Sequence, residues 1–417
     1  MRIKLRSPLR KIAFAAACLI LSARYFELSL RQYLATRLAA VPDLPNLQRA
    51  VRLEPTNAEY RELLGRVLEL SGTNLDDAIS NYRTGADLNP YNPQCWLDLA
   101  GGYQVAGRTR EQEDSVEHAV EADPHTPHVA WDAADLFLVQ GDREKALRYF
   151  GVVLANDPDR VDAALQLCWR FTGDADQIVE RVLPRRPDLY FSFISLLISK
   201  EQVEATESVW NHLIGLHQRF PTKLAFPYFR FLIAKQEVAA AKKAWLQLAS
   251  LNPSLQPYLP SAENLIVNGG FELDILNGGF DWWYQPNPHA VLAIDTTEFH
   301  DGIQSLSITF DGQNASETGI SQFIPVKPNT EYEFSAEYRT EELETASGPR
   351  FSITDPYTNA PYVLTDEILT TNPWRQQRAE FHTGPNTNLV MLKIVRQPAD
   401  LLIRGELWID DLKLAEK

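Results

Sequence analysis

Apolar residues recur at helical spacing from about residue 43 to residue 257, and a proline follows each stretch of this pattern. The prolines are Pro55, Pro90, Pro124, Pro158, Pro187, Pro221 and Pro253, at intervals of 35, 34, 34, 29, 34 and 32 residues. A period near 34 residues with helical periodicity inside it is typical of stacked helix-turn-helix repeats. We therefore predict six helix pairs, stacked as a right-handed solenoid, over residues 43–257.

Small and large apolar residues stand at fixed places within each period, where paired helices can nest. The first three periods carry Leu64, Gly65, Leu68, Ala78, Tyr82 and Pro90; Trp96, Leu99, Ala100, Tyr103, Val116, Ala119 and Pro124; and Ala134, Phe137, Ala146, Phe150 and Pro158. This arrangement resembles the tetratricopeptide repeat family. The later periods depart from it, because the fourth is short and the last two depend on Phe193, Trp210, Phe229 and Trp245. We interpret them as degenerate repeats.

The resemblance implies that the first helix of each pair lines a concave wall, where peptide segments or partner helices dock. By register the candidate wall residues are Glu59, Glu62, Arg66, Glu69, Gln94, Leu97, Gln104, His128, Trp131, Asp135 and Leu138. Trp131 has an alternative role, since large aromatic residues in helical arrays often pack against a neighbouring helix. We predict a protein partner on this wall.

After Pro260 the helical pattern gives way to short alternating apolar runs divided by Gly, Asn, Asp and Pro. Such runs predict β-strands. The candidate strands are Leu265–Asn268, Ala290–Asp295, Gln304–Phe310, Gly319–Pro325, Glu331–Thr340, Arg350–Thr354, Gln376–His382, Val390–Arg396 and Gly405–Leu414. We predict a two-sheet jelly-roll sandwich over residues 263–417, joined to the repeats by a linker at 258–262. The fold class is therefore a multidomain chain, an α-solenoid followed by an all-β sandwich.

The N-terminus predicts an export signal or a membrane anchor. Arg2, Lys4, Arg6, Arg10 and Lys11 precede an apolar run, Ile12–Ala23, in a pattern that looks bacterial. The run suits the apolar core of a signal peptide, and the alternative is a single membrane span that continues through Tyr25, Phe26 and Leu28. We assign residues 1–42 to a signal or anchor and its stem. The expected location is the bacterial envelope, either anchored in the inner membrane and facing the periplasm, or secreted after cleavage.

Composition and charge narrow the classes of partner and activity. The chain has 417 residues and a formal net charge of -15, and residues 262–417 hold 24 acidic and 10 basic residues, or -14 of that charge. A domain this acidic repels phosphate backbones, so no nucleic acid partner is expected.

The three cysteines lack the spacing of a disulfide framework or a zinc site. No catalytic motif appears, and we predict that the protein is not an enzyme.

Four motifs stand out in the last domain: NLIVNGGFE at 264–272, HDGIQSL at 300–306, PVKPNTEY at 325–332 and WIDDL at 408–412. With these motifs, residues 263–415 resemble the carbohydrate-binding jelly rolls attached to xylanases and other glycoside hydrolases, a branch of the galactose-binding-like fold. The resemblance implies that the first and last strands are neighbours, and that Glu272 and Asp410 hold a structural Ca²⁺ with backbone carbonyls near 300–305. Two alternatives remain open: hydrogen-bonded carboxylates without a metal, and Asp411 in place of Asp410 after a register slip.

Aromatic residues supply the candidate glycan-binding surface, because the C–H faces of sugars stack on aromatic rings. The candidates are Trp282, Trp283, Tyr284, Tyr357, Tyr362 and Trp374. Strand alternation places Trp283 on the face opposite to Trp282 and Tyr284, so we expect at least one of the three to belong to the core.

These patterns together favour a non-enzymatic, exported scaffold of the envelope. Its helical repeats would bind a protein, its sandwich would bind a glycan, and its context would be polysaccharide assembly or export. The alternative is a purely structural interaction protein whose sandwich has no affinity for sugars. Exposed aromatic rings around residues 282–284 favour the first hypothesis, and complete burial of those rings favours the second.

Overall fold

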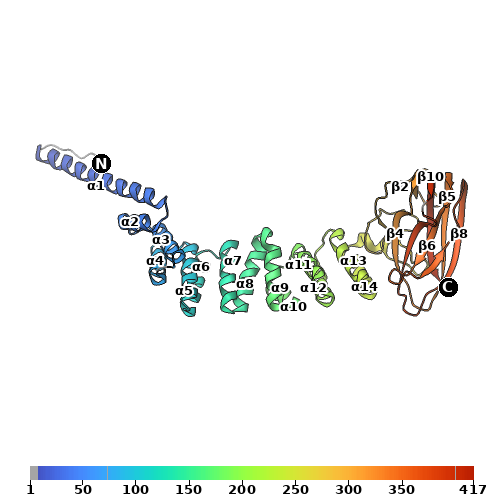
Figure 1. The fold of residues 1–417 in the computed structure, drawn as a ribbon, viewed down its shortest axis with the longest axis horizontal. Coiled ribbons are helices and arrows are strands. Elements are labelled where there is room, and N and C mark those ends of the chain that lie inside the picture. The colour runs from blue at the N-terminus through green and yellow to red at the C-terminus, as the bar shows by residue number, and fades with distance from the viewer. Residues whose placement is uncertain (1–7, 73, 400) are drawn as a thin grey trace. The chain divides into compact units, whose positions relative to one another are not determined.

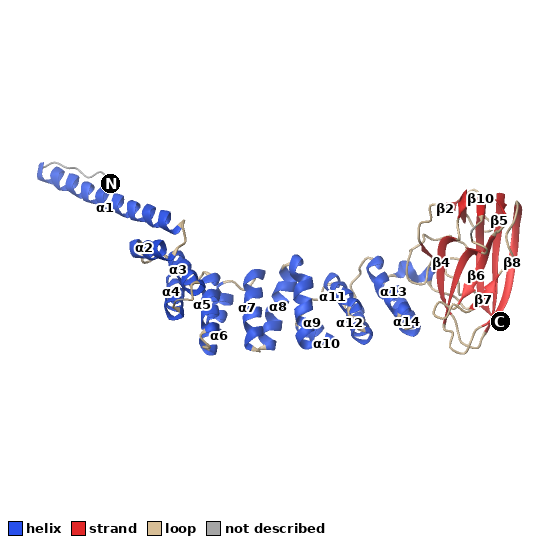
Figure 2. Cartoon of the chain, in the orientation of Figure 1, coloured by secondary structure: helices blue, strands red, loops and turns tan. Residues whose placement is uncertain are grey.

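The computed structural model describes residues 8–72, 74–399 and 401–417, and in this part of the chain all helices precede all strands (Figures 1 and 2). The chain forms two compact units, Met1–Pro184 and Arg185–Lys417, which we call the N-terminal and C-terminal units. The boundary falls inside the repeat array. The sandwich therefore shares a unit with the last helices of the array.

The N-terminal unit consists of helix pairs whose spacing along the chain matches the period of the sequence. Its helices are α1 Pro8–Ala39, α2 Leu44–Leu53, α3 Ala58–Leu70, α4 Leu75–Leu88, α5 Pro93–Val105, α6 Thr109–Ala122, α7 Pro127–Gln140, α8 Arg143–Asn156, α9 Val161–Thr172 and α10 Ala175–Arg181, with the short 3₁₀ helix η1 Pro158–Arg160. Side chains of Asn57, Asn74 and Asn92 accept a backbone N–H at the starts of α3, α4 and α5, as helix N-caps do. The period prolines Pro90 and Pro124 lie just after α4 and α6, where a helix must end.

Close helix packing explains the small residues of the repeat. A Cβ atom on Gly65 of α3 would lie 2.6 Å from Cε1 of Tyr82 on α4, so only glycine lets this aromatic ring nest between the helices. Tyr82 is fully buried, and its hydroxyl donates a hydrogen bond of 2.7 Å to Glu69. The predicted alternation of small and large residues is confirmed at this pair.

The C-terminal unit begins with two further helix pairs: α11 Pro187–Ser199, α12 Val203–Gly215, α13 Phe226–Ala234 and α14 Val238–Leu251, with the 3₁₀ helices η2 Thr222–Ala225 and η3 Pro253–Tyr258. Aromatic residues fill their core, as predicted for the degenerate repeats. The ring centroids of Trp210 and Tyr228 lie 4.8 Å apart, and those of Phe229 and Trp245 lie 5.2 Å apart. Six pairs, from α3–α4 to α13–α14, correspond to the six predicted ones, while α2 packs between α1 and α3.

The β-sandwich follows, with two antiparallel five-stranded sheets (Figure 2). Its strands are β1 Trp283–Tyr284, β2 Ala290–Asp295, β3 Ser305–Asn314, β4 Glu317–Pro325, β5 Glu331–Thr345, β6 Pro349–Thr354, β7 Pro361–Leu364, β8 Asn372–His382, β9 Leu389–Arg396 and β10 Leu402–Glu416. One sheet has the order β1-β4-β9-β6-β7 and the other β2-β3-β10-β5-β8. Phe334 on β5 and Phe351 on β6 meet between the sheets with ring centroids 5.6 Å apart. The predicted sandwich is confirmed.

The first predicted strand, Leu265–Asn268, is wrong. This segment is irregular, although it runs beside the end of β10 through hydrogen bonds from the N–H of Leu265 to the carbonyl of Leu414 and from the N–H of Leu412 to the carbonyl of Gly269. Asn268 and Phe271 have positive φ angles of 51° and 56°, which break a regular ladder. The two ends of the domain are therefore neighbours, as predicted, although the first segment is not a regular strand.

The last helix pair and the sandwich pack directly on each other within the C-terminal unit. Trp245 of α14 meets Phe280 with ring centroids 6.2 Å apart, and the hydroxyl of Tyr258 donates a hydrogen bond of 2.7 Å to the carbonyl of Asp274. The predicted linker at 258–262 thus begins with a buried tyrosine that joins the two parts.

Helix α1 is long and apolar enough to cross a membrane, and none of its apolar window is buried against the rest of the protein. This is compatible with either a signal sequence or an anchor. The basic residues Arg2, Lys4 and Arg6 lie outside the described residues.

Candidate functional site

The outer face of the sheet β1-β4-β9-β6-β7 carries a cavity. Alternation along β4 points Ser321 and Phe323 outward and Ile320 and Ile324 into the core. Strand pairing then places Trp283 of β1 beside Ser321, and Ser321 beside Lys393 of β9. Strand register alone therefore brings aromatic, hydroxyl and cationic side chains into one row.

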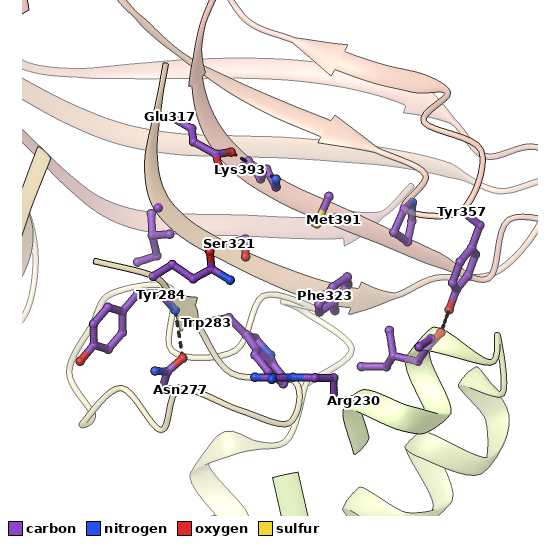
Figure 3. A pocket seen from close by; sticks show the side chains of 16 residues that line it. Arg230, Asn277, Trp283, Tyr284, Glu317, Ser321, Phe323, Tyr357, Met391 and Lys393 are labelled. Carbon is purple, nitrogen blue, oxygen red and sulfur yellow. Dashed lines mark hydrogen bonds and ion pairs between the residues drawn. The ribbon is translucent and has the colours of Figure 1, made fainter. Parts of the chain in front are cut away.

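The cavity has a volume of about 650 Å³, which is in the range of small-ligand sites. Sixteen residues line it: Arg230, Ile233, Ala234, Asn277, Trp283, Tyr284, Gln285, Glu317, Gly319, Ile320, Ser321, Phe323, Pro356, Tyr357, Met391 and Lys393. The first three belong to α13, and the others belong to the sandwich and its loops. Figure 3 shows the sheet on one side of this cavity and the helix on the other.

Three aromatic candidates meet here, each held differently. The indole N–H of Trp283 donates a 2.9 Å hydrogen bond to the carbonyl of Gly279, and the ring stands edge-on to Phe323 with centroids 6.1 Å apart. Tyr284 is 42% exposed, and only its backbone N–H is fixed, by the side chain of Asn277 at 3.1 Å. Tyr357 donates its hydroxyl proton to the carbonyl of Ile233 at 2.8 Å, and burial raises the pKa of Tyr357 to about 12. Tyr284 is thus the ring with the most open surface.

Three charged side chains line the cavity, and two of them form a pair. Lys393 lies 3.2 Å from Glu317, both partly exposed, as the dashed line in Figure 3 marks. The guanidinium carbon of Arg230 lies 4.9 Å from the centre of the Trp283 ring, in a cation–π contact. In the described chain Arg230 has no carboxylate partner. The cavity therefore has an excess of positive charge inside a strongly acidic domain.

The other three aromatic candidates lie elsewhere. Trp282 is 1% exposed, stacks on Phe271 and donates its indole N–H to the carbonyl of Asn268, so its predicted contact with a ligand is wrong for this conformation and it belongs to the core. Tyr362 bonds through its hydroxyl to Thr387 at 2.6 Å and packs on Phe381. Trp374 stands on β8 of the opposite sheet, with its ring centroid 5.6 Å from that of His300.

Several residues of the cavity were not among the sequence candidates. Phe323 and Met391 could have been found from strand alternation, because both are large apolar residues at outward positions, on β4 beside β1 and on β9 beside β4. Arg230 and Ile233 could not, since nothing in the sequence places a helix of the repeats against this sheet.

The predicted calcium ligands lie on either side of Gly270. A Cβ atom on Gly270 would lie 3.6 Å from Oδ1 of Asp410 and 3.8 Å from Cγ of Glu272. Asp410 is fully buried, which raises the pKa of its carboxyl, whereas Asp411 bonds to Nδ1 of His300 at 2.8 Å. Of the two aspartates, Asp410 is therefore the one inside the domain.

Backbone N–H groups already surround these two carboxylates. Oε1 of Glu272 accepts from Ile303 and Gln304, and Oδ2 of Asp410 accepts from His300 and Asp301 at 2.9 and 3.1 Å. Ca²⁺ needs six to eight oxygen ligands. No group of three or more His, Cys, Asp or Glu side chains suited to a metal occurs among the described residues, so carbonyls and water would have to supply the rest. The residues present fit two ligands of such a site, and calcium stays a prediction.

The predicted wall of the N-terminal unit forms a second, smaller cavity of about 240 Å³. Its lining contains Gln94, Leu97, Asp98, Gln104, Asp132, Asp135, Leu136 and Val139, from α5 and α7. Four predicted wall residues, Gln94, Leu97, Gln104 and Asp135, are thus brought together. Partial burial raises the pKa of the Asp132 carboxyl.

Four further wall candidates, Glu62, Arg66, Glu69 and His128, form ion pairs or hydrogen bonds with neighbouring side chains. Arg66 bridges Glu62 at 2.7 Å and Asp98 at 2.6 Å, and burial raises the pKa of Glu62. Glu69 accepts a bond from Tyr82 within its own helix pair, and His128 lies 3.5 Å from Asp132.

Trp131 packs against a neighbouring helix, and its contact with a protein partner stays a prediction. It is half-buried, edge-on to Phe150 with centroids 5.5 Å apart, and Arg160 lies 5.3 Å above its ring. The packing alternative describes this contact with α8, and part of the ring remains exposed.

Comparison with known families bears on the sandwich. Residues 263–401 match the family model described as carbohydrate binding domain. The chain is thus a helical repeat region followed by a sandwich that resembles a carbohydrate-binding module. The matched span contains every cavity residue of the sandwich and excludes Arg230, Ile233 and Ala234 of α13. Among curated proteins, comparison with this sequence finds no significant relative.

Solved structures similar to parts of this chain include one described as "CBM4 structure and function", with 13% identity and a TM-score of 0.29, covering 36% of this chain and 99% of that one. Another is MamA, with 18% identity and a TM-score of 0.27, covering 37% and 95% of the two chains. A third is the CBM22-1 xylan-binding domain from Paenibacillus barcinonensis Xyn10C, with 13% identity and a TM-score of 0.26, covering 36% and 91%.

Proposed function

We propose that the C-terminal unit binds a glycan in the cavity between Tyr284 and Tyr357. The observation that carries the proposal is the cavity itself: it opens on one sheet of a domain that matches a carbohydrate binding domain, and it joins aromatic rings to polar groups. Sugars need both, because their C–H faces stack on aromatic rings while their hydroxyls require hydrogen-bonding partners.

The lining residues divide between these two tasks. Tyr284, Phe323 and Tyr357 present apolar surface for stacking. Asn277, Gln285 and Ser321 offer amide and hydroxyl groups for the sugar hydroxyls. Because Trp283 is covered by Arg230, its part is to hold that side chain and not to stack on the sugar.

Binding without hydrolysis is part of the proposal. A glycosidase of the common type needs two carboxylic groups flanking the scissile bond. The lining of this cavity includes one, Glu317, and its carboxylate is paired with Lys393.

The repeats of the N-terminal unit supply a protein-binding surface in this proposal. Asp98, Asp132 and Asp135 make the groove of α5 and α7 acidic, and Leu97, Leu136 and Val139 give it apolar surface. A partner segment with basic and apolar residues complements such a groove. With α1 as a membrane anchor or signal, the chain would be an envelope scaffold that holds a protein beside a polysaccharide during its assembly or export.

A purely structural sandwich is the competing hypothesis. One observation favours it: α13 covers part of the sheet face that carries the cavity. The 42% exposure of Tyr284 in the wall of the cavity favours glycan binding, because a face of the ring stays free for a sugar to stack on.

A glycan array probed with the purified full-length protein in detergent tests the proposal. We expect binding to at least one glycan class, and we expect Tyr284→Ala to weaken it by about tenfold, which corresponds to the loss of one stacking contact. Tyr91→Ala, a matched change of an exposed tyrosine in the N-terminal unit, should leave binding unchanged. Absence of binding to any glycan would contradict the proposal and favour the structural hypothesis.

A further inference from the structure

We propose that helix α13 completes the glycan site of the sandwich, and that its Arg230 selects a saccharide that carries a carboxylate, such as a uronic acid. The inference rests on the proposed function and adds two points to it. The site is built jointly by the repeat array and the matched domain, and its ligand is an acidic glycan. Neither point follows from the family match, because the matched residues begin at 263, after the end of α13.

The position of α13 over the cavity is fixed by close contacts. Tyr357 reaches across to the carbonyl of Ile233, as the dashed line in Figure 3 shows. A Cβ atom on Gly278 would lie 2.3 Å from Phe226 at the start of α13, and one on Gly279 would lie 2.2 Å from Trp245 of α14. Two consecutive glycines of a sandwich loop therefore let two aromatic rings of the last helix pair approach its backbone. A cavity wall held in this way is part of the site.

Arg230 is placed for recognition and not for structure. It is exposed, it lies over the ring of Trp283, and it points along the cavity in Figure 3. A guanidinium that stacks on an aromatic ring keeps its in-plane N–H donors for a second partner, and carboxylates match that fork with two parallel hydrogen bonds. Trp283 is thus the positioning residue for Arg230.

Charge around the cavity indicates the class of that second partner. Lys393 is neutralised by Glu317, so Arg230 supplies the excess charge of the lining. The surrounding residues 262–417 carry a net charge of -14, yet no carboxylate of the described chain pairs with Arg230. An anionic group on the ligand supplies the missing partner. A neutral saccharide would use the hydroxyl-binding groups and would not form the charge-assisted hydrogen bonds that Arg230 can donate.

The experiment measures binding of short oligomers of galacturonate, mannuronate and glucuronate to the full-length protein in detergent. Each oligomer is compared with its methyl ester, which keeps the sugar and removes the charge, and neutral xylo- and cello-oligosaccharides are measured in parallel. The variants are Arg230→Gln, Arg230→Lys and Arg219→Gln. Arg219 is an exposed arginine just before α13 and outside the cavity, so its substitution matches the change of net charge.

We expect at least one uronate oligomer to bind, and its affinity to fall by about tenfold or more on esterification, because a charge-assisted hydrogen bond is lost. Arg230→Gln should cause a similar loss for the acid and little change for the ester, Arg230→Lys should restore part of the affinity, and Arg219→Gln should have no effect. Binding of neutral oligosaccharides or esters as tight as that of the acids would overturn the inference while the proposed function stands. If no glycan of any class binds, the proposed function itself fails.

Discussion

Tyr357 donates a hydrogen bond of 2.8 Å to the backbone carbonyl of Ile233, a residue 124 positions earlier in the sequence. The donor follows β6 of the sandwich and the acceptor lies near the end of α13. A hydrogen bond over this separation joins the last helix pair to the sandwich, in agreement with the division of the chain into units at residue 184 and not at the end of the repeats. We expect the C-terminal unit to unfold as one cooperative body.

The substitution Tyr357→Phe tests this link. It should lower the free energy of unfolding of the C-terminal unit by about 1 kcal/mol, because one partly buried hydrogen bond is lost and the carbonyl of Ile233 loses a donor. The measurement is urea unfolding followed by tryptophan fluorescence. Tyr284→Phe is the control, since no hydrogen bond of the Tyr284 hydroxyl occurs in the described structure. Equal stabilities of the two variants would contradict the role of Tyr357.

Gly279 offers a second test of the same interface. Gly279→Ala should destabilise the unit by roughly 2–4 kcal/mol, because the new Cβ atom meets Trp245 at 2.2 Å and the residue has a φ angle of 65°. Gly312→Ala separates the two causes, since Gly312 also has a positive φ, 93°, but nothing lies within 4 Å of its Cβ position. We expect thermal unfolding to show a clearly smaller loss for Gly312→Ala. Similar losses would mean that backbone strain, and not the contact with Trp245, limits the position.

The periodic parts of the fold could be predicted from sequence, and the contacts between them could not. Gly65 and Tyr82 stand at repeat positions whose packing follows from the 34-residue period. The strands β2 to β6 and β8 to β10 follow from alternation, whereas β1 and β7 are not among the predicted strands. The segment Leu265–Asn268 has the apolar composition of a strand, but the side chain of Gln322 on β4 binds both the N–H and the carbonyl of Val267, and Asn268 has a positive φ. Strand propensity alone does not show where tertiary contacts make such a segment irregular.

The residues of the candidate site can likewise be separated into those that the sequence indicates and those that it does not. Trp283 and Tyr284 were identifiable because aromatic residues cluster in sequence, and Trp282 was separable from them only once burial was known. Arg230 completes the cavity from a different part of the chain. Its contact with Trp283 depends on the docking of α13, which no local pattern encodes.

A buried carboxyl predicts a pH dependence of stability. Asp281 is fully buried, and desolvation raises its pKa from the ordinary value of 3.8 to about 7, although the N–H of Leu276 donates to it at 2.7 Å. Because the folded-state pKa lies above the unfolded one, the folded state holds the proton more tightly. The contribution of Asp281 to the free energy of unfolding is therefore fully present below about pH 4 and is lost as the pH rises to about 7. The total loss is roughly 4 kcal/mol.

The test is the free energy of unfolding between pH 4 and pH 8 for the wild type and Asp281→Asn. The variant should lack this decline, so the difference between the two proteins should change with pH and become constant above about pH 7. Asp274→Asn, an exposed residue of the same loop, should follow the wild type. Parallel curves for the wild type and Asp281→Asn would show that Asp281 does not titrate in this range.

Calcium is the last prediction, and it concerns the two carboxylates beside Gly270. We expect the melting temperature of the C-terminal unit, measured in the full-length protein, to rise with calcium and to fall with a chelator. A cation would reduce the electrostatic repulsion caused by the net charge of -14 in residues 262–417. It would also offset the free-energy cost of burying the charged carboxylate of Asp410. At 100 times the dissociation constant, a ligand of the folded state adds about 2.7 kcal/mol. Glu272→Gln and Asp410→Asn should abolish the calcium increment, whatever they do to the basal melting temperature, and Asp301→Asn in the neighbouring loop should retain it. If calcium and chelator give the same melting temperature, these carboxylates are held by backbone N–H groups, those of Ile303 and Gln304 for Glu272 and those of His300, Asp301 and Asp411 for Asp410, and the site is hydrogen-bonded structure.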